Sequence, residues 1–500
     1  MADPFYISTA IHYPNGRPHI GHAYEMIAAD AIARYQRQHG RDVFFQTGTD
    51  EHGLKMVKTA RDRGIEAREL ADEMSSYFRE MADVLDISYD RFIRTSEPEH
   101  YAASQAIWQA MADAGDLYLD RYEGWYSVRD EAFYEEKELT AGEGGVKLSP
   151  QGTPVEWTAE ETWFFKLSKY QQPLLDLYAA NPDFIRPESR RNEILRFVEG
   201  GLVDLSVSRT SFDWGVPVPG SPDHVMYVWV DALTNYITGA GYPHDVPRFE
   251  KFWPADIHLI GKDIVRFHAV YWPAFLMSAN LPLPKQVFGH GFLLNRGEKM
   301  SKSVGNVVDP MELATLYGVD ALRYFLLRDV SFGNDGTFSD EAIVTRANAD
   351  LANSFGNLAQ RVLAFIAKNC EGHVPEGKAD EADAVLLAEV DVACAAFRTA
   401  FEDLALSQGV EAWMTGVFAC NQYIDAQAPW ALRKTDPERM NAVLRTLLRA
   451  IRHLATTILP VIPTSAGKML IQLPSADDED FRIAAPTPIF PRLELQASDA

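Results

Sequence analysis

The start of the chain alternates between two hydrophobic patterns. Residues 5–10 are short, apolar and partly β-branched, which predicts a buried strand, and residues 42–47 predict a second one. Between them, residues 21–38 place apolar side chains on one stripe at helical spacing, and Gly40 ends this predicted helix. Strand, helix and strand within about 45 residues form a βαβ unit, so the pattern predicts a parallel, doubly wound sheet of Rossmann type.

Further along the chain, the pattern changes twice. Residues 116–225 hold many aromatic residues, glycines and prolines with short strand-like pieces, which predicts an α+β insertion in the α/β domain. Residues from about 340 onward are rich in Ala, Leu and Arg at helical spacing, which predicts an all-α helix bundle. The other expected elements are helices over roughly 54–84 and 98–115 and strands at 117–119, 124–128, 226–230 and 257–261.

Length and composition define the broad class. The chain has 500 residues, which predicts three or four structural units, and its apolar fraction of 47% permits large buried cores. Residues 1–4 lack the basic and apolar stretches of a secretory signal, and no long apolar run indicates a membrane span. Three scattered cysteines, Cys370, Cys394 and Cys420, fit reduced and mostly buried thiols rather than a zinc site of paired cysteines. We therefore expect a cytoplasmic protein that does not contact a membrane.

The net charge of −24 argues against a nucleic-acid binder, because such proteins usually carry a basic surface. Net charge is a sum over the whole surface, however, whereas binding depends on the local field. Basic residues do gather between Arg433 and Arg452. An exposed helix face is the simpler explanation for this run, so composition alone leaves contact with nucleic acid open.

A His-Ile-Gly-His motif, His19 to His22, lies where the first predicted strand passes into the helix. The first N–H groups of a helix lack intrahelical partners and carry partial positive charge, so a phosphate binds there readily. Two histidines three residues apart add donors on the same side, and Gly21 lets a nucleotide ring approach the backbone. Two surface histidines at a helix start are the plain alternative, and small nucleotidyltransferases use the same motif.

A second motif, Lys299-Met300-Ser301-Lys302-Ser303, follows a turn at residues 295–298. Its lysines and serines could close over a triphosphate and neutralise the charge that develops on the leaving pyrophosphate. A lone loop of lysine and serine is usually only a solvated loop. This particular sequence, far downstream of the first motif, makes chance agreement remote.

The two motifs resemble the signatures of the class I aminoacyl-tRNA synthetases, and the chain resembles the methionyl-tRNA synthetase family over nearly its whole length. The resemblance rests on six separated segments in the family's order, which are residues 10–16, 49–53, 227–232, 260–268, 357–361 and 428–430. Six matches in order are far more specific than any one of them. The resemblance implies activation of L-methionine by ATP to methionyl-adenylate and its transfer to the 3′ end of tRNA(Met), with release of AMP and pyrophosphate.

The resemblance also implies roles for individual residues. Those expected to act in catalysis are His19, His22, Lys299 and Lys302, of which the two lysines act on the phosphates. Those expected to bind ATP are His19, Gly21, His22, Gly261, Asp263, Leu293 and Lys302, with the backbone at Phe292 and Leu293 reading adenine. Those expected to bind methionine are Ile11, Tyr13, Asp50, Trp229, Ala232, Leu233, Tyr236, Ile264, His268 and Trp272, with Asp50 and the Ile11 backbone on its ammonium. The anticodon residues would be Asn357, Arg361 and Trp430, and Arg209 matches a family arginine near the reaction centre.

The chemistry of methionine suits these assignments. A thioether offers no hydrogen-bond donor, and each sulfur–aromatic contact contributes about 0.3–1.5 kcal/mol. Ordinary core packing would account for Trp229, Tyr236 and Trp272 equally simply. The methionine carboxylate is ionised at pH 7, so attack on the α-phosphorus needs no general base, and neither Asp231 nor Glu25 is assigned as one. Mg²⁺ is expected to arrive with ATP.

The resemblance gives domain boundaries as well. They are 1–115 and 226–290 for the two halves of the Rossmann catalytic domain, 116–225 for the connective insertion, 291–340 for the second motif and stem contacts, 341–474 for the helical anticodon-binding domain and 475–500 for a tail. The fold class expected is therefore α/β, with an inserted α+β domain, followed by an all-α bundle.

The chain departs from the family pattern in three places. Many relatives carry zinc-binding cysteines in the insertion, but this insertion has none, so we expect a knuckle closed by turns at 142–145 and 149–152, without structural zinc or another bound metal. Leu233 stands where the family's pocket often has proline. Some members of the family have an extra C-terminal domain that binds tRNA and forms dimers, whereas this chain ends soon after its helices, so we expect a monomer. The resemblance also implies initiator and elongator tRNA(Met) as partners.

Three other interpretations remain. Synthetases for isoleucine, leucine or valine usually carry an editing domain larger than this insertion, and the cysteine enzyme needs thiolate zinc ligands. A small-molecule nucleotidyltransferase would leave the second motif and the helical third unexplained. A synthetase-like binding or regulatory protein without activity predicts decayed catalytic motifs, and no decay is seen.

Overall fold

The computed structural model describes residues 2–130, 132–295, 297–300, 306–474 and 482–495. The chain divides into two compact units, the first made of residues 1–29, 40–83 and 87–290 and the second of residues 30–39, 84–86 and 291–500. Helix α1 (Ile20–Gln38) therefore begins in the first unit and ends in the second. None of the helices in the described part of the chain is long and apolar enough to span a membrane.

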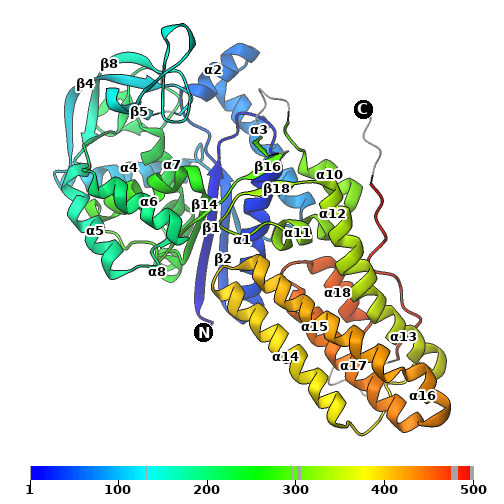
Figure 1. Ribbon diagram of the computed structural model, residues 1–500. Coiled ribbons are helices and arrows are strands. Elements are labelled where there is room, and N and C mark those ends of the chain that lie inside the picture. The colour runs from blue at the N-terminus through cyan, green and yellow to red at the C-terminus, as the bar shows by residue number, and fades with distance from the viewer. Residues whose placement is uncertain (1, 131, 296, 301–305, 475–481, 496–500) are drawn as a thin grey trace. The chain divides into compact units, whose positions relative to one another are not determined.

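A six-stranded sheet forms the centre of the first unit (Figure 1). Its strands lie in the order β3-β2-β1-β14-β15-β9, and every neighbouring pair is parallel. Their bounds are β1 (Pro4–His12), β2 (Asp42–Thr49), β3 (Arg91–Arg94), β14 (Ile257–Gly261), β15 (Val287–His290) and β9 (Ile185–Arg186). The central strands are almost continuous runs of buried residues, as expected of a parallel sheet covered on both faces. The predicted Rossmann-type sheet is confirmed.

Eight further helices belong to the first unit as described: α2 (Leu54–Arg63), α3 (Ala67–Val84), α4 (Pro98–Asp113), α5 (Gln171–Ala180), α6 (Glu188–Glu199), α7 (Val228–Ala240), α8 (Val246–Phe252) and α9 (Trp272–Ser278). The helical stretch predicted over 54–84 is two helices, because Gly64 adopts a left-handed φ of 68° and ends α2. Helix α7 packs against α4 and against strands β1 and β3. It therefore lies on the sheet, beside the end of β1.

The strand predicted at residues 226–230 is wrong. Strand β13 (Ser221–Met226) ends there and belongs to a small antiparallel sheet, and helix α7 begins at Val228. Every residue of α7 except Trp229 is buried, and periodicity alone cannot distinguish a helix buried on all sides from a buried strand. The helix lies so close to β2 that a Cβ atom on Gly239 would be 1.5 Å from Gln46 Oε1.

The insertion is built on one long antiparallel pair. Strands β4 (Leu117–Ser127) and β8 (Glu156–Phe165) pair along their length, so the two strand-like pieces predicted at 117–119 and 124–128 are one strand. Shorter strands accompany them: β5 (Ala132–Tyr134), β6 (Thr140–Ala141), β7 (Lys147–Leu148), β10 (Leu205–Ser206), β11 (Ser208–Arg209) and β12 (Pro217–Val218). Strand β9 comes from the same stretch of sequence, yet it pairs with β15 in the main sheet.

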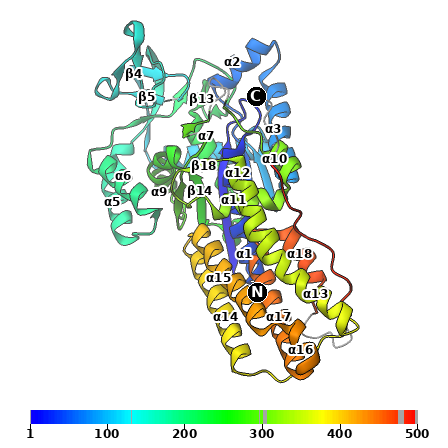
Figure 2. The same ribbon diagram turned by 45° about the vertical axis from the view of Figure 1, so that its right-hand side comes forward.

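The second unit is mainly helical, which confirms the predicted all-α bundle. Its helices are α10 (Pro310–Tyr317), α11 (Val319–Arg328), α12 (Asp340–Arg346), α13 (Asn357–Asn369), α14 (Glu381–Glu402), α15 (Leu406–Gln427), α16 (Pro429–Thr435), α17 (Pro437–Ile458) and α18 (Pro463–Ile471), and its strands are β16 (Leu293–Asn295), β17 (Glu298–Lys299) and β18 (Gly336–Phe338). Figures 1 and 2 show α14, α15 and α17 side by side. Cys394 and Cys420 are buried among these helices, and burial raises the pKa of Cys420 to about 12.

A buried ion pair anchors the end of α1 in the second unit. Arg323 of α11 and Asp30 of α1 have fully buried side chains, and Nη2 lies 2.6 Å from Oδ2. The guanidinium also donates to the carbonyl oxygens of Pro460 and Val461, and Asp30 accepts a second bond from Arg34 at 2.7 Å. The pair satisfies two charges that would be costly to bury alone.

Candidate active site

A cavity of about 390 Å³ opens in the first unit where β1, β2 and β14 end. Ligands of open α/β sheets bind at the carboxyl ends of the strands, so this is the expected location. The cavity brings together most of the residues that the sequence implicated in the first unit: Ile11, Tyr13, His22, Asp50, Trp229, Ala232, Leu233, Tyr236, Gly261, Asp263, Ile264 and His268. Segments far apart in the sequence thus converge on one site.

Several implicated residues lie elsewhere. Trp272 is fully buried and donates from Nε1 to His258 Nε2 at 3.3 Å, so it packs behind Tyr236 and does not line the cavity. Its assignment to the methionine site stays a prediction. His19 and Gly21 are also outside the cavity lining.

The remaining ATP residues were assigned to the region after β15. Phe292, Leu293 and Lys299 belong to the second unit, and Lys302 lies outside the described residues. Their roles stay predictions.

The polar end of the cavity is a neutral hydrogen-bonded pair. His268 Nδ1 lies 2.9 Å from the carbonyl oxygen of Ile264, so Nδ1 carries the ring hydrogen. His268 Nε2 then accepts from the Tyr236 hydroxyl at 2.7 Å. Burial lowers the pKa of His268 to about 4 and raises the pKa of Tyr236 well above its ordinary value. Both groups are therefore uncharged at neutral pH.

An aromatic wall adjoins this pair. The rings of Trp229 and Phe267 stack with centroids 3.8 Å apart and planes 5° from parallel. Phe267 and His268 belong to a π-helical turn, Phe267–Tyr271, a rare conformation that is frequent at functional sites. Together with Leu233 and Ile264, the wall gives an apolar and polarizable surface that suits a thioether.

The His-Ile-Gly-His motif lies at the start of α1, as predicted. The backbone N–H of Gly21 donates to His19 Nδ1, and that of His19 donates to His22 Nδ1, both at 3.0 Å. The two rings lie 3.9 Å apart between centroids. A Cβ atom on Gly21 would be 2.8 Å from His19 Cε1, so a larger residue here would displace the His19 ring from this position. In neutral form both rings carry their hydrogen on Nε2.

Other lining residues were not implicated by the sequence. Glu25 joins two strands, because Oε1 accepts from the Ala10 N–H at 3.0 Å and Oε2 lies 2.7 Å from His290 Nε2. This structural role agrees with leaving Glu25 unassigned as a base. His12 and Lys55 also line the cavity. His12 lies within the matched segment 10–16 but had no assigned role, and Lys55 lies just after the segment 49–53.

The insertion supplies three lining residues, Arg129, Asp130 and Gln151. Asp130 Oδ2 accepts hydrogen bonds from Ser149 at 2.6 Å, from Tyr134 at 3.0 Å and from Thr153. The backbone N–H of Ser149 donates to the carbonyl of Thr153, which closes the predicted turn at 149–152. No group of three or more His, Cys, Asp or Glu in the described ranges could hold a metal ion, and the absence of zinc stays a prediction.

Arg209, on strand β11 of the insertion, is almost fully buried. Its guanidinium lies over the rings of Tyr227 and Tyr126, with its central carbon 4.7 Å and 5.4 Å from their centroids. It donates to Ser206 Oγ at 2.9 Å and to the Ser208 carbonyl at 2.6 Å. Arg209 is not part of the cavity lining, so its proximity to the reaction centre stays a prediction.

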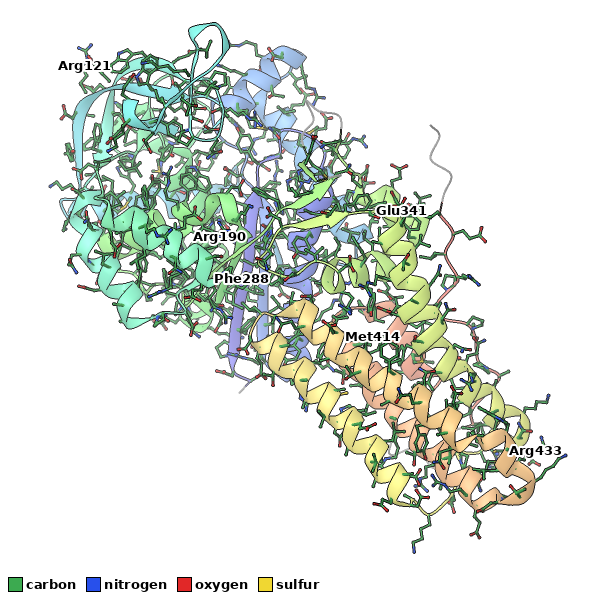
Figure 3. The ribbon with its side chains drawn as sticks, in the orientation of Figure 1. Arg121, Arg190, Phe288, Glu341, Met414 and Arg433 are labelled. Carbon is green, nitrogen blue, oxygen red and sulfur yellow. The ribbon has the colours of Figure 1, made fainter. Side chains whose placement is uncertain are left out.

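The helical unit has a second cavity, of about 530 Å³, lined by Arg361 and Trp430. The Arg361 guanidinium lies 5.1 Å from the Trp430 ring centroid and pairs with Asp425 at 2.8 Å. Three more cationic side chains line this cavity: Lys368, Arg433 and Lys434. Figure 3 shows Arg433 directed outward at the end of the bundle. Asn357, one turn before Arg361 on α13, is exposed and outside the lining.

Buried histidines make the stability of the first unit depend on pH. Burial holds the pKa of His268 at about 4, below its ordinary value of 6.5, so the folded chain keeps it neutral while the unfolded chain protonates it. The unfolded state binds more protons between these values, so stability is complete above pH 6.5 and falls as pH decreases toward 4, by about 3 kcal/mol for this residue. Denaturant unfolding at several pH values should show a smaller loss for H268Q than for the wild type. H244Q, at an exposed histidine, should match the wild type; equal slopes in all three would contradict the assignment.

The sheet, the cavity at its carboxyl edge and the helical unit define a class I tRNA synthetase. Residues 5–363 match the model of the family "tRNA synthetases class I (M)", and residues 374–487 match "Anticodon binding domain of methionyl tRNA ligase". The chain is 59% identical to the methionine–tRNA ligase of Brucella suis and 54% identical to that of Mycobacterium tuberculosis H37Rv, each over 98% of both chains.

It is also similar to a solved structure of Mycobacterium tuberculosis methionyl-tRNA synthetase in complex with methionyl-adenylate, with a TM-score of 0.94 and 54% identity over 98% of this chain and 100% of that one. The chain belongs to the methionyl-tRNA synthetase family, which confirms the resemblance seen in its sequence.

Proposed function

We propose that this chain activates L-methionine with ATP and transfers the methionyl group to the 3′ end of tRNA(Met). The observation that carries the proposal is the cavity itself, which combines the Asp50 carboxylate with the neutral Tyr236–His268 pair and the Trp229–Phe267 wall. A carboxylate suits an ammonium group, and an uncharged aromatic end suits a thioether. The solved relative with methionyl-adenylate supports the same chemistry.

Each group of residues in the proposed site contacts a different part of the substrates. Asp50 and the Ile11 backbone hold the methionine ammonium, while Tyr236 and His268 face the sulfur. The substrate carboxylate is already ionised and attacks the α-phosphorus of ATP without a general base, so catalysis depends on alignment and charge stabilisation. His19, His22, Lys299 and Lys302 serve the phosphates in this proposal. Mg²⁺ comes with ATP, bound chiefly by phosphate oxygens.

Methionine-dependent exchange of pyrophosphate into ATP tests the proposal. Exchange should require methionine and should be absent with isoleucine, leucine, valine or cysteine. Exchange that depends on another amino acid would reject the methionine assignment, and a protein that binds ATP and methionine without exchange would reject the enzymatic role.

Replacing Trp430 by alanine should weaken tRNA charging and leave exchange intact. Stacking of an anticodon base on an aromatic ring contributes about 1–3 kcal/mol, so kcat/KM for tRNA(Met) should fall about 5- to 150-fold. Phe418 offers a matched control, because it is 50% exposed on the same unit, close to the 47% of Trp430, but does not line the cavity. F418A should charge tRNA normally. Equal losses of kcat/KM for tRNA(Met) in both variants would mean that Trp430 supports only the fold and does not contact the anticodon.

The proposal includes both initiator and elongator tRNA(Met) as partners of a monomeric enzyme. Charging assays with the two transcripts should give kcat/KM values of the same order, because the proposed contacts are with a shared anticodon. Light scattering during size-exclusion chromatography should give a mass near the 56.1 kDa of one chain. A mass near twice that value would reject the monomer.

A further inference from the structure

We propose that Asp231 is a positioning residue of the methionine site, which holds the loop that carries Asp50 against helix α7 by bonding to His52. This inference deepens the proposed function and rests on it. The cluster consists of Asp231, His52 and His100, and the three side chains are at least 98% buried.

The Asp231 carboxylate bridges two histidines. Its Oδ2 lies 2.6 Å from His52 Nδ1, and its Oδ1 lies 2.6 Å from His100 Nε2. The three residues come from different parts of the chain: His52 from the loop after β2, His100 from α4 and Asp231 from the first turn of α7. One side chain therefore joins three elements of the first unit.

The contacts of the cluster favour an ionised Asp231 carboxylate. The hydroxyl of Thr238 donates to the Thr234 carbonyl at 2.9 Å, so its oxygen accepts from His100 Nδ1 at 3.1 Å. The other nitrogen of His100, Nε2, lies 2.6 Å from Asp231 Oδ1 and 3.2 Å from Ser104 Oγ. Burial raises the pKa of Asp231, but the two histidines outweigh burial and bring it to about 2. The hydrogen bonds to this ionised carboxylate are short and directional.

The loop between β2 and α2 carries both His52 and Asp50, the residue expected to hold the methionine ammonium. The N–H of Asp50 donates to the His12 carbonyl at 2.9 Å, which ties this end of the loop to β1. The Glu51 carbonyl accepts from Trp214 Nε1 at 2.6 Å. His52 then reaches Asp231 with one nitrogen and the Tyr101 hydroxyl with the other, at 3.0 Å.

Asp231 thereby sets the distance between two halves of the methionine site. Its neighbours on α7, Trp229, Ala232, Leu233 and Tyr236, line the side-chain pocket, whereas Asp50 lies on the loop. A displacement of about 1 Å between substrate-holding groups can cost about 10²-fold in rate. The residues assigned to ATP in this unit lie instead at the start of α1 and at the end of β14 or just after it. Loss of Asp231 should therefore impair methionine use more than ATP use.

Four substitutions and one control test the positioning role in ATP–pyrophosphate exchange. D231N and H52A should each raise the KM for methionine about 10-fold or more, with the KM for ATP within about 3-fold of the wild type. H52N places an amide nitrogen where Nδ1 lies and should recover most of the loss, and H100Q places one where Nε2 lies and should be mild. The double variant D231N/H52A should be little worse than either single one, because both remove the same bond.

Asp116 supplies the matched control. It is 1% exposed and accepts bonds from Lys169, Tyr170 and Ser278, but it does not line the cavity. D116N should lower the unfolding temperature and leave the KM for methionine unchanged.

The positioning role is overturned if D231N and H52A lower only the unfolding temperature, as D116N does, or if they raise both KM values equally. If D231N does not fold, the KM values for methionine of H52A and H52N test the role instead. A KM close to the wild type in H52N supports it, and equally raised values in both variants reject it. Wild-type exchange tests the proposed function separately: an inactive wild type rejects that function, whereas an active wild type with unaffected variants rejects only the role of Asp231.

Discussion

Replacing Asp50 by alanine is expected to lower kcat/KM for methionine by about 10²- to 10³-fold in ATP–pyrophosphate exchange. Asp50 lines the cavity and is only 8% exposed, so the charge pair it would form with an ammonium group is shielded from water. Truncating one partner of such a pair costs about 2–5 kcal/mol, and each 1.4 kcal/mol is a factor of ten. The loss should appear mainly in the KM for methionine.

Two further measurements separate charge from shape. D50N keeps the size of the side chain and removes its charge, so it should lose nearly as much activity as D50A. The KM for ATP should stay within about 3-fold of the wild type in both variants. Normal methionine binding by D50N would show that the carboxylate does not hold the ammonium.

Replacing Arg323 by leucine should be the most destabilising single change in the second unit that we describe. It leaves the Asp30 carboxylate fully buried without the Arg323 guanidinium, and breaking a buried pair in this way costs about 3–5 kcal/mol. Urea unfolding followed by far-UV circular dichroism should show the main helical transition at a clearly lower urea concentration.

Arg34 provides the comparison. It bonds the same Asp30 oxygen, but its side chain is 22% exposed, so R34L should cost about 1 kcal/mol. R323L/D30N should recover part of the loss, because both charges of the buried pair are then absent. Equal losses for R34L and R323L would mean that burial of the Arg323 pair does not matter.

The sequence predicted those elements at whose boundaries the spacing of hydrophobic residues changes clearly from strand to helix or back. β1, α1 and β2 were found within a few residues of their bounds, because a strand pattern, a helical stripe and a second strand follow one another. Helix α7 was missed because its burial on all sides removes the polar face that identifies a helix. Its β-branched and aromatic start, Val228 to Val230, then favoured a strand.

The residues of the site that the sequence indicated lie in the two motifs, in the matched segments or within a few positions of them. Trp229 and His268 lie in such segments and line the cavity, whereas Trp272, also assigned to the pocket, packs behind Tyr236. Arg129 and Gln151 reach the cavity only through the folding of the insertion, which no local pattern reports. Asp231 and His52 are bonded across 179 positions of sequence, and no spacing rule connects them.

The helical unit is not a transferable module that starts where its sequence pattern starts. A piece beginning at residue 291 would contain Arg323 but lack Asp30, since the structure groups residues 30–39 of α1 with the bundle. Exchange of this unit between relatives, by recombination or by design, therefore has to include the end of α1. The helix that opens with His19-Ile20-Gly21-His22 and the bundle should consequently be inherited together.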